Sequence, residues 1–151
     1  MEAVDLRSDS RSRTIPATPD EVFAAIAEPE RIARWWGPSG FTNTLHEFDF
    51  VPGGRWLLTM HGPDGQGYPN ESRFSRIEPG RVVQIEHLSG HHFFLTLELS
   101  AVAGGTRVHW LQTFDTAEHY RQIAQFVAQA NVQNLERLAH EVGRVGSGKR
   151  P

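Results

Sequence analysis

The chain has 151 residues, of which 38% are hydrophobic and 22% charged, and its formal net charge at neutral pH is −3. This composition is typical of one globular domain, and the slightly acidic balance gives no general attraction to nucleic acid or to an anionic membrane. The sequence contains no cysteine, which excludes disulfides, thiol nucleophiles and thiolate metal ligands.

Polar tails are expected to flank one domain over residues 10–142. Residues 1–9 are polar and charged, and residues 143–151 are rich in glycine and basic side chains, so both segments are expected to be flexible. The N-terminal part has no apolar stretch of signal-peptide length, and no run approaches the roughly 20 apolar residues that cross a bilayer. We therefore expect a soluble, cytoplasmic protein without membrane insertion.

A short strand and two short helices are predicted first along the chain. Residues 11–15 are predicted as a strand. A helix follows, because Thr18 can cap it, Pro19 suits its first position and Glu21 completes a capping box. A second helix is predicted over Pro29–Trp36, where a Gly-Pro pair ends it.

From residue 41 onward the apolar pattern has a period of two. Turn signals rich in glycine and proline separate the segments, and connections this short force antiparallel neighbours. The sequence therefore predicts a six-stranded meander, with strands at about residues 42–50, 54–61, 68–77, 81–89, 91–101 and 105–114.

The alternation predicts one apolar, inner face and one polar face. The residues expected to point inward are His46, Phe48, Phe50, Trp56, Leu58, Met60, Val83, Ile85, His87, Phe93, Leu95, Leu97, Leu99, Val108, Trp110, Gln112 and Phe114. This face is too large for two short helices to cover. A long helix over residues 117–142 carries an apolar stripe, broken only by Asn131, and is predicted to cover it. The fold class is therefore α+β.

Several local motifs resemble one protein family. They are the strand-to-helix segment IPATPDEVF at 15–23, WWGP at 35–38, PGGRW at 52–56 with Met60 and GPDG at 62–65, and GGTRV at 104–108. In this order and spacing, over about residues 11–142, they resemble the branch of the START-like (SRPBCC) superfamily described as activator of Hsp90 ATPase homologue 1-like.

That resemblance implies the helix-grip fold, also called Bet v 1-like, in which a curved antiparallel sheet wraps around a long C-terminal helix. It implies a ligand cavity between the two and a stress-related role. Members of the branch often carry Gly-Trp in the last helix, where this chain has Ala130 and Asn131. Without that indole, we expect a wider and more polar cavity.

The expected ligand is a small hydrophobic or aromatic molecule, with no cofactor and no metal. The residues expected to bind it are Trp35, Phe48, Trp56, Leu58, Met60, Phe74, Ile85, Leu95, Trp110, Gln112, Val127, Asn131 and Leu135. Trp35 and Trp36 are adjacent on a short helix, so their side chains cannot point the same way. One is expected to be buried and the other to lie near the cavity mouth or a dimer contact.

Two other functions remain open from the sequence. A polyketide cyclase-like enzyme would use a cavity histidine, His46 or His87, for proton transfer. A chaperone-interacting module would use its outer face, although no Hsp90-type contact is expected, because the eukaryotic co-chaperones use a separate N-terminal domain. A homodimer is compatible with the sequence. His91 and His92 face opposite ways on a strand, so no metal site is expected there.

Overall fold

A computed structural model describes residues 6–148, with side chains described through Arg144. The outermost parts of the two predicted tails, residues 1–5 and 149–151, lie outside the described residues. Among the described residues, no helix is long and apolar enough to cross a membrane.

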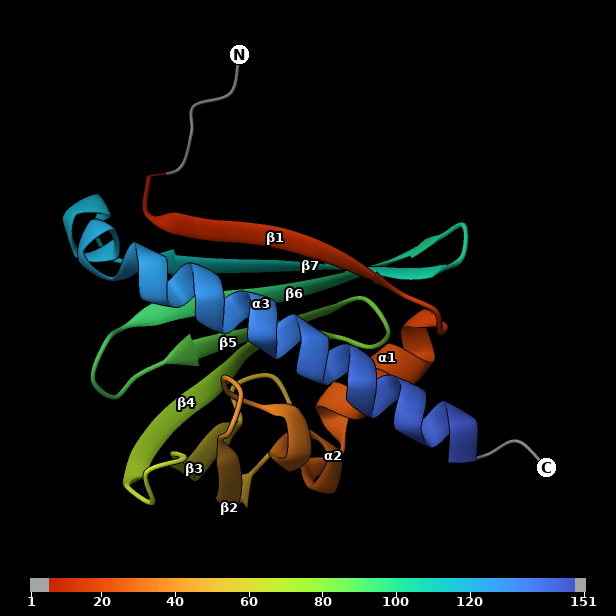
Figure 1. Cartoon of the computed structure of the whole chain (residues 1–151), viewed down its shortest axis with the longest axis horizontal. Coiled ribbons are helices and arrows are strands. Elements are labelled where there is room, and N and C mark those ends of the chain that lie inside the picture. Colours follow the sequence, from red (N-terminus) through yellow and green to blue (C-terminus); the bar gives the residue numbers. More distant parts are fainter. Residues whose placement is uncertain (1–5, 149–151) are drawn as a thin grey trace.

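The core of the fold is a seven-stranded antiparallel sheet (Figure 1). Its spatial order is β1-β7-β6-β5-β4-β3-β2, so the predicted six-stranded meander is confirmed and the first strand pairs with the last. The strands are β1 (Ser8–Ile15), β2 (Thr42–Phe48), β3 (Arg55–His61), β4 (Gly67–Glu78), β5 (Val82–His87), β6 (Phe93–Val102) and β7 (Gly105–Phe114).

Three helices pack on one side of this sheet. The long α3 (Ala117–Gly148) lies across the inner face, and the short α1 (Pro19–Ala27) and α2 (Pro29–Trp35) lie beside its C-terminal half (Figure 1). The predicted capping box of α1 is present, with Glu21 N donating to Thr18 Oγ1 at 3.2 Å and Thr18 N to Glu21 Oε1 at 2.8 Å. The helix-grip prediction is thereby confirmed.

Two element ends differ from the sequence prediction by three residues or more. α3 continues to Gly148 rather than ending at residue 142, since a single glycine such as Gly143 costs a helix only about 1 kcal/mol. β1 begins at Ser8 rather than at residue 11, because β7 is long enough to pair with it as far as Thr113. The earlier start places Asp9 inside the sheet, where it is 5% exposed.

The inward position predicted for His46 was wrong. The pairing of β2 with β3 shifts register between Leu45 and Glu47, so one extra residue is inserted in the strand at His46. This bulge reverses the alternation, and the exposed imidazole lies on the outer face with Nε2 2.8 Å from Thr59 Oγ1.

The hydrophobic core joins the sheet to α3 through residues that lie opposite each other on neighbouring strands. Val83 pairs with Leu97 and Leu97 with Trp110, and all three are buried. Ile85 and Leu95 form the adjacent row. Leu138 of α3 is fully buried in the same cluster. The inner face of the sheet and α3 enclose a trough. A residue's position along this trough decides whether it faces the packed core or a cavity.

Candidate functional site

A cavity of about 260 Å³ lies between the inner face of the sheet and the first half of α3. Its wall consists of side chains from β3 to β7, the segment that follows α2, and α3 from Phe126 to Asn134. Most of these side chains are apolar, and a few polar groups converge among them. Cavities of this composition are the usual sites for small molecules.

Some residues predicted to bind a ligand line this cavity and others do not. Those in the wall are Met60, Leu95, Trp110, Gln112, Val127 and Asn131. The remaining predicted residues belong to the adjoining core: Trp35, Phe48, Trp56, Leu58, Phe74, Ile85 and Leu135. Their aromatic rings pack on one another, with Trp56 stacked on Phe74 at 5.7 Å, so that end of the trough is filled.

The remaining cavity residues lie outside the predicted ligand site. They are Trp36, Gly37, Pro38, Phe41, Asn70, His91, Phe93, Phe126, Ala130 and Asn134, together with His87, which was predicted only as a catalytic candidate. Many belong to the segment after α2 or to strand ends, which lack the periodicity that marks an inward face. Phe126 is 67% exposed although it contributes to the wall, so it lies at the opening.

The two adjacent tryptophans have different environments, as predicted. Trp35 is 1% exposed and its Nε1 donates to the carbonyl oxygen of Ala25 at 2.9 Å. Trp36 is half-buried and lines the cavity, with its ring 4.9 Å from that of Trp56. The local geometry after α2 therefore uses one indole for the core and presents the other to the cavity.

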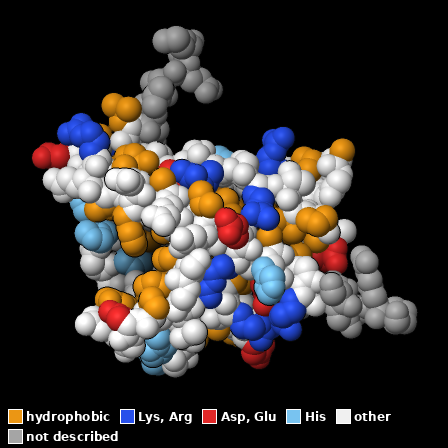
Figure 2. Space-filling view, in the orientation of Figure 1, with side chains coloured by type: hydrophobic (Ala, Val, Ile, Leu, Met, Phe, Trp, Pro, Cys, Tyr) orange, Lys and Arg blue, Asp and Glu red, His pale blue; other side chains and the backbone are white. Residues whose placement is uncertain are grey.

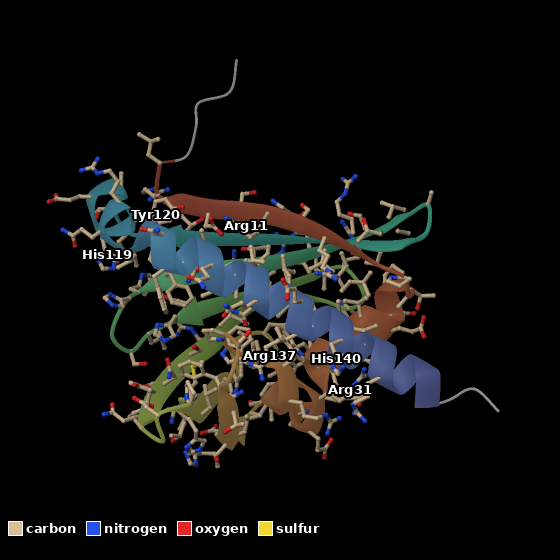
Figure 3. The ribbon with its side chains drawn as sticks, in the orientation of Figure 1. Arg11, Arg31, His119, Tyr120, Arg137 and His140 are labelled. Carbon is tan, nitrogen blue, oxygen red and sulfur yellow. The ribbon has the colours of Figure 1, made fainter. Side chains whose placement is uncertain are left out.

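A buried polar network forms one end of the cavity wall. Asp9 receives two hydrogen bonds from Arg11, each 2.8 Å long, and a third from Nδ2 of Asn131 at 3.0 Å. The same Nδ2 donates to Oε1 of Gln112 at 2.9 Å. Tyr120 also interacts with Asp9. Figure 3 shows Tyr120 in the first turns of α3 and Arg11 on the adjacent β1.

Asp9 is held in its charged form. Burial alone would raise the pKa of its carboxyl group, but hydrogen bonds from Arg11 and Asn131 outweigh that effect and lower the pKa below its usual value. The network therefore contains a carboxylate that can only accept hydrogen bonds at neutral pH.

His87, at the end of β5, also lines the cavity, on the side opposite the Asp9 network. Its Nδ1 lies 2.6 Å from the carbonyl oxygen of His91, and its Nε2 lies 2.7 Å from Oδ1 of Asn70. The ring stacks on Phe93 at 4.6 Å. Burial lowers the pKa of His87, so the ring is neutral at physiological pH. A neutral imidazole has only one N–H, so one ring nitrogen donates to its neighbouring oxygen and the other has no proton to donate.

The indole N–H of Trp110 is a buried donor of a wall residue. Trp110 is 2% exposed, and within the described part of the chain nothing accepts a hydrogen bond from its Nε1. A buried N–H group without an acceptor costs about 1–3 kcal/mol, and a water molecule or a ligand oxygen can remove that cost.

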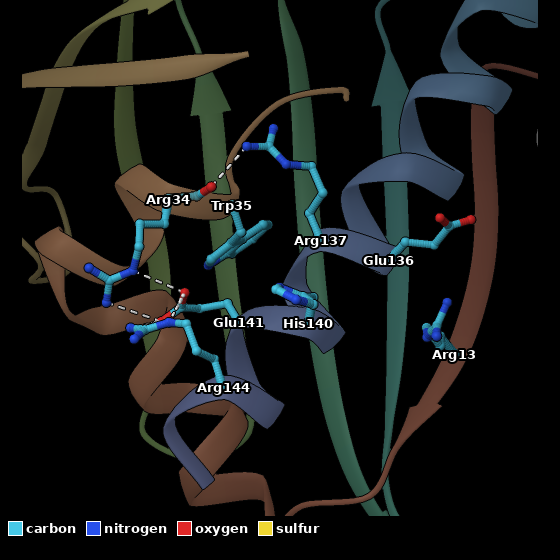
Figure 4. A pocket seen from close by; sticks show the side chains of 8 residues that line it. All are labelled: Arg13, Arg34, Trp35, Glu136, Arg137, His140, Glu141 and Arg144. Carbon is cyan, nitrogen blue, oxygen red and sulfur yellow. Dashed lines mark hydrogen bonds and ion pairs between the residues drawn. The ribbon is translucent and has the colours of Figure 1, made fainter. Parts of the chain in front are cut away.

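A second hollow, of about 830 Å³, lies on the other side of α3's C-terminal half, beside α2 and β1 (Figure 4). Arginine and histidine side chains gather over this region (Figure 2). Most of its guanidinium groups already have partners. Arg34 and Arg144 donate to Glu141 at 3.0–3.2 Å, as does the buried Arg31 at 3.0 Å. Arg137 donates to backbone carbonyl oxygens.

We therefore interpret this larger hollow as a contact region between helices. The smaller apolar cavity is the candidate ligand site. Metal binding has no support from geometry, since no group of three or more His, Asp or Glu side chains among the described residues could hold an ion.

Comparison with known proteins agrees with this architecture. The sequence model of the family described as "Activator of Hsp90 ATPase homolog 1-like protein" matches residues 16–143. No curated protein matches the sequence significantly. A solved protein from Nitrosomonas europaea is 16% identical, with a TM-score of 0.85 over 95% of this chain and 99% of its own.

Two further structures have the same fold. A protein from Arthrobacter aurescens is 21% identical, with a TM-score of 0.84 over 95% of this chain and 90% of its own. An AHSA1-like protein from Aeromonas hydrophila is 23% identical, with a TM-score of 0.73 over 95% of this chain and 97% of its own. The fold and the family match together show that this chain belongs to the activator of Hsp90 ATPase homolog 1-like family, within the START-like (SRPBCC) fold.

Proposed function

We propose that the chain binds a small hydrophobic or aromatic molecule, bearing a polar group, in the cavity between the sheet and α3. The observation that carries this proposal is a largely apolar cavity of about 260 Å³ with a few polar groups in its wall. The volume lies just below the range of about 300–1,000 Å³ that holds drug-sized ligands. A ligand of one or two rings is therefore the appropriate size.

The enzyme alternative has weaker support. His46 lies outside the cavity, and both ring nitrogens of His87 lie within 2.7 Å of oxygen atoms of the wall. The chaperone-interacting alternative depends on the family resemblance alone. Homodimer formation, a stress-related role and a cytoplasmic location remain predictions from the sequence.

The proposal can be tested by filling the cavity. Acetophenone, a one-ring ketone, serves as the probe, and its dissociation constant is measured by titration followed by two-dimensional NMR. We expect Asn131→Trp to weaken binding at least tenfold, because an indole would occupy the space. Ala130→Phe provides a second filling variant that leaves Asp9 and its partners in place, in case Asn131→Trp disturbs folding.

Gln125→Trp is the matched control, since it adds the same indole at an exposed position on the same helix. It should bind acetophenone like the wild type. The proposal would be wrong if acetophenone and toluene both fail to bind the wild-type protein. It would also be wrong if both filling variants fold and bind as tightly as the control.

A further inference from the structure

The polar network next to the cavity fixes which hydrogen-bonding groups the wall can offer. Its origin is Asp9 of β1, which is not itself a wall residue. A carboxylate has no hydrogen to donate, so every partner of Asp9 must present a donor to it. Arg11 does so with two N–H groups, and Asn131 does so with Nδ2.

This contact determines the orientation of the Asn131 amide. An amide can be turned by 180° with little change in shape, and its orientation follows from its hydrogen bonds. Nδ2 has two hydrogens, and both are used, one toward Asp9 and one toward Gln112 Oε1. Oδ1 of Asn131 is therefore the atom that remains as an acceptor.

The orientation of the Asn131 amide in turn determines the orientation of the Gln112 amide. Because its Oε1 accepts from Asn131, its Nε2 remains with two hydrogens to donate. Among the described residues, neither Nε2 of Gln112 nor Oδ1 of Asn131 has a hydrogen-bond partner. Both residues line the cavity, so a bound molecule meets one donor and one acceptor at this end. Trp110, two residues earlier on the same strand face, has an unpartnered Nε1–H that is itself buried.

We propose that the cavity selects an uncharged ligand whose polar end carries both an acceptor and a donor, as an aryl carboxamide does, and that Asp9 sets this preference as a positioning residue. The inference depends on the proposed ligand-binding function. A carbonyl oxygen of the ligand would accept from Gln112 Nε2, and its N–H would donate to Asn131 Oδ1. A ketone satisfies only the first group, and a hydrocarbon satisfies neither.

Three probes of similar size separate these cases: benzamide with a donor and an acceptor, acetophenone with an acceptor only, and toluene with neither. Dissociation constants are measured by NMR titration. For the wild type we expect benzamide to bind about tenfold tighter than acetophenone, which corresponds to one additional hydrogen bond. The side-chain NH₂ resonances of Gln112 should shift with benzamide and acetophenone but not with toluene.

Asp9→Asn tests the positioning role. An asparagine at residue 9 can donate as well as accept, so it no longer imposes one orientation on Asn131. We expect the preference for benzamide over acetophenone to fall to about twofold, with toluene binding unchanged. Asp49→Asn, which neutralises an exposed carboxylate on the same chain, is the control and should keep the tenfold preference.

Gln112→Glu keeps the shape of the side chain but removes its donor, so it tests the ligand class even if Asp9→Asn does not fold. It should weaken benzamide about tenfold and leave toluene unchanged. The inference is overturned, with the proposed function intact, if the wild type binds all three probes equally. A full preference retained in folded Asp9→Asn overturns the role of Asp9. Failure of all three probes to bind the wild type overturns both proposals.

Discussion

Two histidines near the connection between β5 and β6 have opposite electrostatic environments. His87 ends β5 inside the cavity wall, and burial lowers its pKa. His92 precedes β6 on the outer side, where Nε2 lies 2.8 Å from Glu86 Oε2 and Nδ1 lies 2.7 Å from Asp115 Oδ1. Hydrogen bonds from the ring to these two carboxylates raise the pKa of His92. The two side chains, five residues apart, are therefore expected to lose their protons at different pH values.

An NMR titration of the histidine ring carbons between pH 5 and pH 9 should resolve this difference. We expect His87 to lose its proton below the ordinary histidine pKa of about 6.5, and His92 above it. Because the folded pKa of His92 is raised, its ion pairs stabilise the fold below pH 6.5 and are lost as pH rises through that folded pKa. Glu86→Gln should lower the pKa of His92. Titration of both histidines at one common pH would contradict the assignment.

At the scale of elements, the sequence predicted most of the fold because its signals are local. The capping residues of α1, the turn glycines and the period of two in the sheet each act within a few residues. The start of β1 was missed because the strand is polar, with Asp9 and Arg11 on its inner face, and pairs only with a strand about 100 residues away. The bulge at His46 reverses the alternation, and an extra residue in a strand leaves no signal in the hydrophobic pattern.

The candidate site was less predictable than the fold. Part of its wall comes from side chains whose position depends on the packing of one element against another. The wall segment after α2 is an example. Asn134 Oδ1 accepts from the backbone of Gly37 at 2.9 Å, and Arg137 contacts several carbonyl oxygens of the same segment. These contacts join residues about 100 positions apart, and composition or periodicity does not indicate them.

Arg137 is the principal link between α3 and that segment. Its Nη1 donates to the carbonyl oxygens of Gly37 and Pro38 at 2.7 and 2.8 Å, and its Nη2 to those of Arg34 and Phe41 at 2.8 Å each. Arg137→Ala should lower the free energy of unfolding by about 3 kcal/mol, because it leaves several carbonyl groups without a donor. It should also weaken acetophenone binding, since the same segment forms part of the cavity wall.

Urea unfolding measures the first effect and NMR titration the second. Arg121→Ala, an exposed arginine on the same helix, is the control and should change stability by less than about 0.5 kcal/mol. An Arg137→Lys variant should lie between the two, because an ammonium group has three donors and no planar fork. Equal stability of Arg137→Ala and Arg121→Ala would show that the backbone contacts do not hold the segment.

At the scale of the whole molecule, the two parts of α3 have different surroundings. Residues 126–134 form one side of the apolar cavity, and residues 136–144 form one side of the charged hollow beside α2 (Figure 4). The charged half attaches the helix to the α1 and α2 layer, and this attachment positions the other half above the sheet. A change that loosens the charged half is therefore expected to alter the cavity as well as the stability of the fold.

Glu141 is the centre of the charged half and should control stability in acid. It is 3% exposed and receives hydrogen bonds from Arg31, Arg34 and Arg144. Burial would raise its pKa, but hydrogen bonds from Arg34, Arg144 and Arg31 outweigh burial and lower the pKa from 4.5 to about 2. The resulting stabilisation, at most about 3 kcal/mol, is present above pH 4.5 and is lost as pH falls toward 2.

Glu141→Gln should therefore destabilise the protein most at neutral pH, by about 3 kcal/mol, because it leaves three guanidinium groups without their carboxylate. As pH falls from 4.5 toward 2, wild-type Glu141 becomes protonated, and the difference between the two proteins should shrink. Urea unfolding at pH 7, 4.5 and 2.5 measures this difference. Glu136→Gln, an exposed carboxylate on the same helix, should match the wild type at every pH. A Glu141→Gln deficit that stays constant across this range would mean that the carboxylate keeps α3 in place by its shape and not by its charge.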